Sequence, residues 1–230
     1  MNQIVTEAII LARTDYGEAD RILTLLTPDD GKLRLMAKGV RRVKSKLAGG
    51  IELFSVSTIT FVKGRGDIGT LVSTRLVRYY KHIVEDLDRT MLGYELIKQL
   101  NKVTEDHPEP EYFELLKQVF EALDDPTIPL PLVRFWFTAQ LLKQSGHSPN
   151  LHADDSGQRL QPERAYNFSF EQVCFAPSEK GRFSAQHIKF LRLSFDGHPP
   201  KVLTQVEGGA VLVDALAPLV STMLQTYLRV

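Results

Sequence analysis

Apolar and polar residues alternate through the first eighty positions, the pattern of strands with one buried face. Five such runs, rich in Ile, Val, Thr and Phe, are separated by turns that contain Gly, Asp or Pro. Five strands without a long helix among them, and with a longer connector between the third and the fourth, fit a small closed barrel of the OB type. The predicted strands lie at residues 4–13, 21–27, 32–38, 51–63 and 68–80.

After residue 80 the apolar positions recur with a period of about 3.6, which is typical of amphipathic helices. The helix predicted at residues 133–146 is apolar almost all round, as expected at the centre of a bundle, and Pro218 should kink or restart the last helix. Residues 147–182 indicate loops and short strands instead. The predicted helices lie at residues 88–103, 111–123, 133–146, 184–193 and 211–228.

The chain is therefore predicted to be a multidomain α+β protein. Its 230 residues are enough for one large domain or two small ones, each with a core of its own. We expect an OB-fold nucleic-acid-binding domain at residues 1–80 and an α-helical domain at residues 81–230. The loop-rich segment at residues 147–182 is expected to form a separate module within the helical domain.

Export and disulfide bonding find no support in the composition. No uninterrupted apolar run approaches the roughly 20 residues that span a bilayer. The N-terminus, MNQIVTEAII, lacks the basic start and the cleavable apolar segment of a signal peptide. The single cysteine, Cys174, excludes an internal disulfide and a zinc site built from several thiolates. A cytoplasmic protein is the simplest interpretation.

Charge is divided unevenly along the chain, although the net charge is zero. Residues 1–81 carry 14 Lys and Arg against 8 Asp and Glu, which leaves the remainder with a net charge of −6. Within residues 32–81 there are 12 cations and two acids, Glu52 and Asp67. Such a concentration attracts phosphates, with an affinity that should weaken steeply as salt is added.

The densest run of cations is KLRLMAKGVRRVKSK, residues 32–46. Its first part alternates, which puts Lys32, Arg34 and Lys38 on the face opposite Leu33 and the other apolar residues. This basic surface would bind the phosphates of a polyanion, although a sheet face kept basic for solubility is the alternative. The predicted contacts to DNA are Lys32, Arg34, Lys38, Arg41, Arg42, Lys44 and Lys46, with Lys63, Arg65 and Arg75 nearby.

Aromatic side chains could add stacking platforms for bases, as in other OB barrels. The candidates are Tyr16, Phe54 and Phe61, but packing in the core is the more frequent fate of a single aromatic, and we expect it over stacking for each of them. No phosphate-binding GxxxxGK[ST] and no HExxH motif is present, and Cys174 between apolar neighbours suits a buried position. The sequence therefore predicts no enzyme and no cofactor.

Arg134 is the only charged residue between Asp125 and Lys143. An arginine beside an apolar groove could bind the terminal carboxylate of a partner's tail, with Phe135 or Trp136 near the tail's apolar side chains. The alternative is an ion pair between Arg134 and an acid on a neighbouring helix.

Two segments carry a family resemblance: DYGEADRILTLLT at residues 15–27 and AKGVRRVKSKLAGG at residues 37–50, with Gly31 and Phe54. Together with GHSPN at residues 146–150, they make the chain similar to the RecO family of bacterial recombinational repair proteins. The resemblance implies an OB barrel joined to a helical domain, binding of single- and double-stranded DNA, and annealing of complementary strands. It also implies help in loading recombinase onto strands coated by single-stranded DNA-binding protein. The implied partners are RecR and the acidic C-terminal tail of that coating protein, and the implied location is cytoplasmic, at the nucleoid when acting.

The chain departs from that family after GHSPN. Many members carry four cysteines there as a zinc finger, whereas this sequence has only Cys174. We therefore expect a cysteine-depleted, zinc-finger-like insert at residues 147–182 that holds no zinc and is maintained by packing. Two other functions stay open: an RNA- or ribosome-associated OB-fold binding protein, or a metal-dependent nuclease, which would need clustered acids.

Overall fold

The computed structural model describes residues 2–64, 66–104 and 110–228, and the chain divides into two compact units. The barrel unit is Met1–Asp125, and the C-terminal unit is Pro126–Val230. The predicted boundary at residue 80 falls directly after the last barrel strand, whereas the barrel unit continues to Asp125 because two of the helices that follow contact barrel strands.

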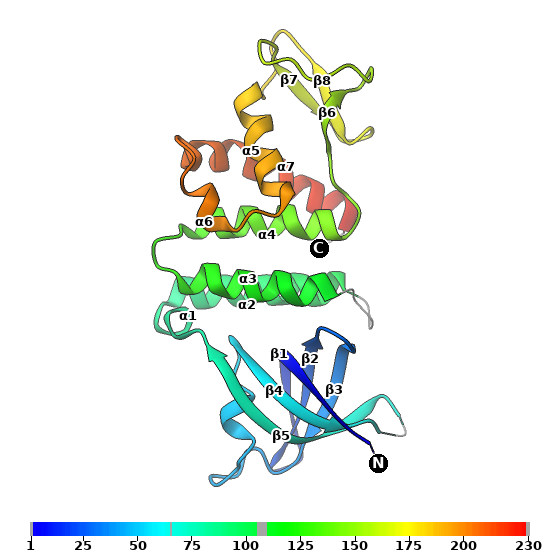
Figure 1. The fold of residues 1–230 in the computed structure, drawn as a ribbon, viewed down its shortest axis with the longest axis vertical. Helices are drawn as coiled ribbons and strands as arrows, with labels where there is room; N and C mark the ends of the chain where they lie inside the picture. The colour runs from blue at the N-terminus through cyan, green and yellow to red at the C-terminus, as the bar shows by residue number, and fades with distance from the viewer. Residues whose placement is uncertain (1, 65, 105–109, 229–230) are drawn as a thin grey trace. The chain divides into compact units, whose positions relative to one another are not determined.

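The five predicted strands form a closed barrel in the order β1-β2-β3-β5-β4 (Figure 1). All neighbouring strands are antiparallel except β3 and β5, which run parallel, so the OB-type arrangement is confirmed. The strands are β1 (Gln3–Tyr16), β2 (Asp20–Thr27), β3 (Gly31–Ala37), β4 (Ser55–Val62) and β5 (Ile68–Tyr79).

The barrel interior is filled by apolar side chains that alternate along each strand. Ile10, Leu25 and Ile59 are completely or almost completely buried, and Leu35 lies beside them. Burying each such side chain contributes about 1.5–3 kcal/mol, which fixes the register and turns the intervening residues outward. The basic residues of β3 point outward for this reason.

The fourth strand begins later than predicted. Residues 51–54 are not part of β4, because Phe54 has a φ of 56° and the Ser55 hydroxyl donates a 2.7 Å hydrogen bond to the carbonyl of Glu52. The turn sends the Phe54 ring outward from the barrel, where a Cβ on Gly93 would come within 2.5 Å of it. The apolar residues at 51–54 therefore reflect packing and not an extended strand.

Three helices follow the barrel within the same unit: α1 (Lys81–Glu85), α2 (Leu87–Val103) and α3 (Pro110–Asp124). The Asp86 side chain caps α2 by accepting a 3.0 Å hydrogen bond from the Arg89 amide. Phe54 and Tyr80 both make edge-to-face contacts with Phe120 of α3, which joins the barrel to the helices. The two long helices confirm the predictions, whereas α1 is too short to produce a helical period.

The C-terminal unit is built around α4 (Leu130–Gln144), which is buried from Leu132 to Leu142 except at Arg134. This confirms the expected central helix. The last helix, α7, is long and apolar enough to cross a membrane by length and composition alone, but Leu216, Val220 and Met223 are buried in the unit. It continues through Pro218, so the expected restart does not occur. The other helices of the unit are α5 (Ala185–Asp196), α6 (Pro200–Leu203) and α7 (Gly209–Leu228).

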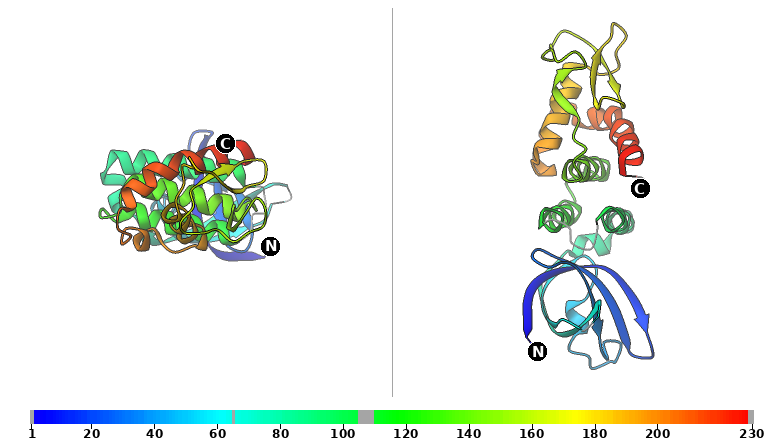
Figure 2. Two further views of the ribbon diagram at one scale, coloured as in Figure 1. Left: turned by 90° about the horizontal axis from the view of Figure 1, so that it is seen from above. Right: turned by 90° about the vertical axis from the view of Figure 1, so that its right-hand side faces the viewer.

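The loop-rich segment forms a small sheet in the order β6-β8-β7, visible at one end of this unit (Figures 1 and 2). The Phe175 ring makes edge-to-face contacts with Tyr166, Phe168 and Phe183. The sheet therefore has an aromatic core of its own. Its strands are β6 (Asn150–Asp154), β7 (Tyr166–Ser169) and β8 (Cys174–Pro177).

Candidate nucleic-acid interface

The basic connector between β3 and β4, residues 38–54, is anchored to the hairpin between β1 and β2. The Gly39 amide donates a 2.6 Å hydrogen bond to the Asp20 carboxylate, and the Arg41 amide donates a 2.9 Å bond to the carbonyl of Ala19. Gly39 has a φ of 65°, a left-handed conformation that a glycine adopts without strain. The chain therefore leaves β3 in a fixed direction before its densest run of cations.

Asp15 adds an electrostatic contact at the same place. Its carboxylate accepts a 2.7 Å hydrogen bond from the Arg21 guanidinium and lies 3.6 Å from the guanidinium of Arg41. The hydrogen bond from Arg21, with the nearby positive charges, lowers the pKa of the Asp15 carboxyl. Asp15 thus orients Arg41 of the connector, and Asp20 holds the connector's backbone at Gly39.

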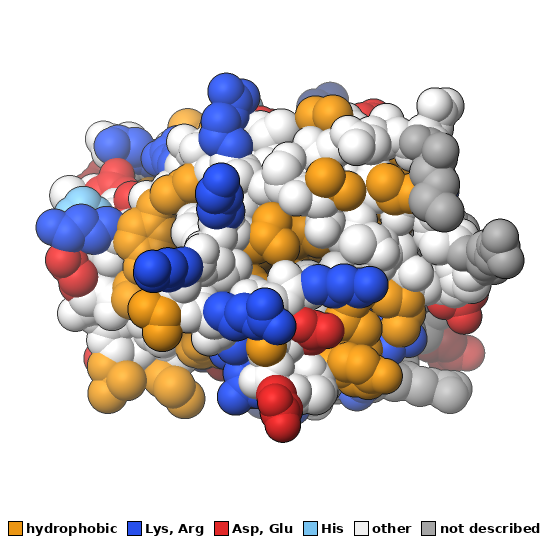
Figure 3. Space-filling model, turned by 90° about the horizontal axis from the view of Figure 1, so that it is seen from below, with side chains coloured by type: hydrophobic (Ala, Val, Ile, Leu, Met, Phe, Trp, Pro, Cys, Tyr) orange, Lys and Arg blue, Asp and Glu red, His pale blue; other side chains and the backbone are white. Residues whose placement is uncertain are grey.

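Most of the predicted phosphate-binding side chains are exposed. Figure 3 shows the barrel face from below, where Lys and Arg side chains are spread among apolar ones and acidic side chains are fewer. Val43, between cations of the connector, is fully exposed. The exposed members of the predicted set are Arg34, Lys38, Arg41, Arg42, Lys44, Lys46, Lys63 and Arg75.

Three members of the set already have partners within the barrel unit. The Lys32 ammonium donates hydrogen bonds of 2.8 and 2.7 Å to the carbonyls of Asn101 and Thr104 at the end of α2. Lys63 pairs with Asp30 at 2.9 Å, and Arg41 pairs with Asp15 as described above. Arg65 lies outside the described residues. Lys32 is therefore bound to α2, whereas Arg41 and Lys63 are exposed although each has an ion-pair partner.

Of the three candidate stacking residues, two belong to the core. Phe61 is 1% exposed inside the barrel and Phe54 is 2% exposed against α2 and α3, so neither ring has a face that a base could cover. Tyr16, at the end of β1, is 56% exposed. Core packing, the expected fate of a single aromatic in this part of the chain, is thus confirmed for the two phenylalanines, and Tyr16 is left as an accessible aromatic.

The predicted groove beside Arg134 is not formed by its neighbours. Phe135 and Trp136 are buried, the first stacked on Phe190 with ring centroids 5.7 Å apart, the second donating a 2.7 Å hydrogen bond to the carbonyl of His198. Arg134 itself is exposed on α4. Both aromatic side chains serve the core of the C-terminal unit, which corrects their expected role as the apolar side of a tail-binding site.

The loop-rich sheet does not offer the ligands of a zinc finger. Among residues 2–64, 66–104 and 110–228, no group of three or more His, Cys, Asp and Glu side chains could hold a metal ion. Cys174 is buried in β8, and this burial raises the pKa of its thiol, which disfavours the thiolate that zinc requires. The residues present therefore do not fit a structural zinc ion.

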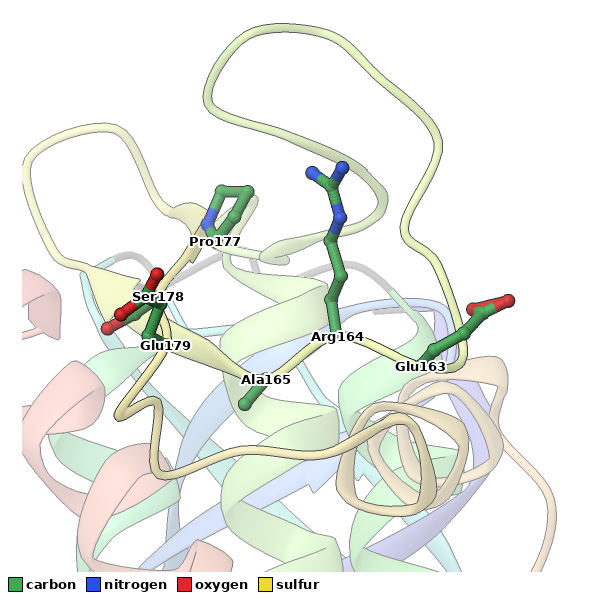
Figure 4. Close-up of a pocket in the computed structure, with 6 residues that line it drawn as sticks. All are labelled: Glu163, Arg164, Ala165, Pro177, Ser178 and Glu179. Atoms are coloured by element: carbon green, nitrogen blue, oxygen red, sulfur yellow. The ribbon is translucent and has the colours of Figure 1, made fainter.

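A carboxylate organises the turn after β6 instead. Asp154 accepts hydrogen bonds from the Ser156 hydroxyl at 2.7 Å, from the Ser156 amide at 3.0 Å and from the Gln158 amide at 2.8 Å. Nearby, an open hollow of about 510 Å³ lies between two loops of the sheet (Figure 4). Its lining mixes acidic, basic and neutral residues: Glu163, Arg164, Ala165, Pro177, Ser178 and Glu179.

Comparison with known proteins gives consistent matches along the chain. The family model described as Recombination protein O N terminal matches residues 1–80, and the model described as Recombination protein O C terminal matches residues 84–229. The chain is 36% identical to the DNA repair protein RecO of Dehalococcoides mccartyi over 147 residues, which are 64% of this chain and 57% of that protein. It is 38% identical to the DNA repair protein RecO of Myxococcus xanthus over 193 residues, which are 81% of this chain and 70% of that protein. It is 30% identical to that of Halalkalibacterium halodurans over 197 residues, with 82% and 76% covered.

Proposed function

The chain belongs to the RecO family of DNA repair proteins, and on that premise we propose that it is a recombination mediator that binds DNA through its barrel. In this role it binds single- and double-stranded DNA, anneals complementary strands and helps to load recombinase onto strands coated by single-stranded DNA-binding protein. No bond in the DNA is made or broken, so the protein acts without a catalytic residue or a cofactor. It works in the cytoplasm and associates with the nucleoid when it acts on DNA.

One observation carries the DNA-binding proposal: exposed cations gather on a connector whose base is fixed to the barrel. The Gly39–Asp20 and Arg41–Ala19 hydrogen bonds hold that base. Beyond it, Arg42, Lys44 and Lys46 are exposed, and no ion pair of theirs is found among the described residues. Cations that need not break an existing ion pair can neutralise phosphates at little cost.

Contacts to phosphates do not distinguish one base from another, so the proposed binding is independent of the DNA sequence. Each neutralised phosphate releases counterions, which makes the affinity fall with salt. Neutralisation also reduces the repulsion between two strands, so the same surface favours annealing without a chemical step. Arg34, Lys38 and Arg75 extend the proposed contact surface, and Lys63, Arg41 and Arg65 are further candidates. Lys32 belongs to the same basic run, but its ammonium is bound to α2, so it should contribute least to DNA binding.

The proposed protein partners are RecR and the acidic tail of single-stranded DNA-binding protein. An exposed arginine, Arg134, supports a contact with the tail's carboxylate, although Phe135 and Trp136 are buried. Titration with a peptide of the tail sequence tests this contact. Arg134→Ala should weaken peptide binding, and equal affinity of the variant and the wild type would retire the proposal for this residue.

Removal of charge from the connector tests the DNA-binding proposal. The variant Arg42→Ala, Lys44→Ala, Lys46→Ala should bind an oligodeoxynucleotide more weakly, and its slope of log affinity against log salt should be flatter by roughly 2 for single strands. A matched control removes three exposed cations of the C-terminal unit: Lys180→Ala, Arg182→Ala, Lys189→Ala. Both variants change the net charge by the same amount, so general electrostatics affects them alike.

The two variants should differ in DNA affinity and in the rate at which they anneal complementary strands. The connector variant should lose affinity and anneal complementary strands slowly, whereas the control should match the wild type. Equal loss in both variants would mean that net charge and not the connector attracts DNA, and unchanged binding by the connector variant would leave its cations as a solvated surface.

A further inference from the structure

Tyr16 shares a surface with two of the exposed cations. Leu23, Leu25 and Leu35 point into the barrel, so alternate residues of the same strands point outward. In the ladder Tyr16 lies opposite Asp20, and Thr24 lies opposite Arg34. These pairs place Tyr16 and Arg34 on the outer face of the β1–β2–β3 sheet.

Lys38 continues the same outer face beside the hairpin. Arg21–Ala37 is the last pair of the β2–β3 ladder, and the Gly39 amide is bonded to the Asp20 carboxylate, so Lys38, between Ala37 and Gly39, lies beside Asp20. The backbones of Tyr16 and Lys38 are therefore two strand spacings apart, about 10 Å. The carboxylate of Asp20, which lies between them, is already bound by the Gly39 amide. A single ligand can therefore touch both the tyrosine ring and the lysine ammonium.

The backbone at Tyr16 is held on both sides. Asp15 before it is bonded to Arg21, and Gly17 after it has a φ of 57° that starts the turn into β2. The carbonyl of Gly17 also accepts a hydrogen bond from the Arg41 side chain. An exposed ring on such a backbone loses little freedom when a ligand covers it. Tyr79 is the other large exposed aromatic among the described barrel strands, and it lies at the end of β5.

We propose that Tyr16 stacks on an unpaired base of single-stranded DNA while Lys38 binds a neighbouring phosphate and Arg34, four residues back along β3, binds a phosphate farther along the same strand. This inference rests on the proposed function, because it assigns a contact within the same DNA-binding surface. Within a duplex each base is covered by its neighbours, whereas an unpaired base offers a free aromatic face. Tyr16 therefore gives the barrel a preference for single strands that cations alone do not provide.

The test compares Tyr16→Ala with the wild type on three probes: oligodeoxythymidylate, an abasic strand of the same length, and a duplex. Loss of one stacked base should weaken oligodeoxythymidylate binding by roughly 5- to 150-fold. Binding of the abasic strand and of the duplex should be unchanged, and so should the salt slope, because no charge is removed. Tyr16→Phe should retain the wild-type affinity, and Tyr79→Ala, the matched control, should retain it as well.

A second variant, Tyr16→Trp, reports stacking directly. Its indole fluorescence should be quenched by oligodeoxythymidylate and not by the abasic strand. Equal binding of oligodeoxythymidylate by Tyr16→Ala and the wild type, or no quenching of Tyr16→Trp, would overturn the inference. If the Arg42, Lys44 and Lys46 variant still loses affinity in that case, the proposed DNA-binding function stands without the stacking contact. A wild-type protein that binds none of the three probes would overturn both.

Discussion

Lys32 should act as a structural cation, although the sequence groups it with the DNA-binding residues. Its ammonium donates to the carbonyls of Asn101 and Thr104, two of the backbone acceptors that the end of α2 leaves without helical partners. Positive charge is also favourable at the C-terminus of a helix. Replacement by methionine keeps most of the aliphatic stem and removes only the ammonium group.

The expected cost of Lys32→Met is about 1–3 kcal/mol in the free energy of unfolding of the barrel unit. Each hydrogen bond from a charged donor contributes about 1.5–3 kcal/mol. The two hydrogen bonds of Lys32 together should contribute less than the sum of two such values, because the site is partly exposed and water can replace the ammonium as a donor. This corresponds to a decrease of roughly 0.5–1.5 M in the urea midpoint of that unit.

Urea denaturation followed by two probes measures this change. The only tryptophan, Trp136, belongs to the C-terminal unit, so its fluorescence reports that unit, while far-UV circular dichroism reports both. Lys44→Met is the matched control, since Lys44 is exposed on the connector. Lys32→Met should lower the midpoint in circular dichroism and leave the tryptophan transition unchanged. An unchanged midpoint together with a loss of DNA affinity as large as that of Lys44→Met would refute the structural role.

Three further predictions follow from the packing and the loop-rich sheet. Gly93→Ala should destabilise the barrel unit by about 1–3 kcal/mol in urea denaturation, because the new Cβ would meet Phe54, whereas Gly49→Ala, with nothing within 4 Å, should be nearly neutral. The hydrogen bond from Ser156 and those from nearby amides lower the pKa of Asp154, so this carboxylate stabilises the turn above its ordinary pKa and loses that effect as the pH falls through the lowered pKa. Asp154→Asn should therefore remove part of the acid sensitivity of the thermal midpoint, and an identical pH profile in the variant would contradict this. Metal analysis of the purified chain should find no bound zinc, and one zinc per chain would refute the expectation drawn from its lone Cys174.

The sequence was sufficient for the elements whose period is long and regular. The five strands, α2, α3 and α4 all lie close to their predicted positions, because alternation and helical period record which face of each element is buried. The predicted start of β4 is wrong because the apolar side chain of Phe54 packs against Gly93 and not in the barrel core. A local pattern of apolar residues does not distinguish these two kinds of contact. The predicted tail-binding role of the aromatic residues beside Arg134 is wrong for the same reason. α4 is buried on nearly all sides, so its apolar residues pack in the core and leave no apolar face for a partner.

Charge is the property for which sequence and structure differ most in what they reveal. Counting cations puts Lys32, Lys63 and Lys44 in one class, yet Lys32 holds α2, Lys63 pairs with Asp30, and Lys44 is exposed on the connector. A cation with an internal partner must give up that interaction before it can bind a phosphate, so its gain from DNA is smaller. The affinity of the barrel for DNA should therefore depend on fewer cations than the sequence suggests. The cations that have internal partners should instead fix the positions of the exposed ones. On this reasoning, single removals along residues 32–63 should divide into two groups, one that changes the urea midpoint and one that changes the salt slope, with little overlap between them.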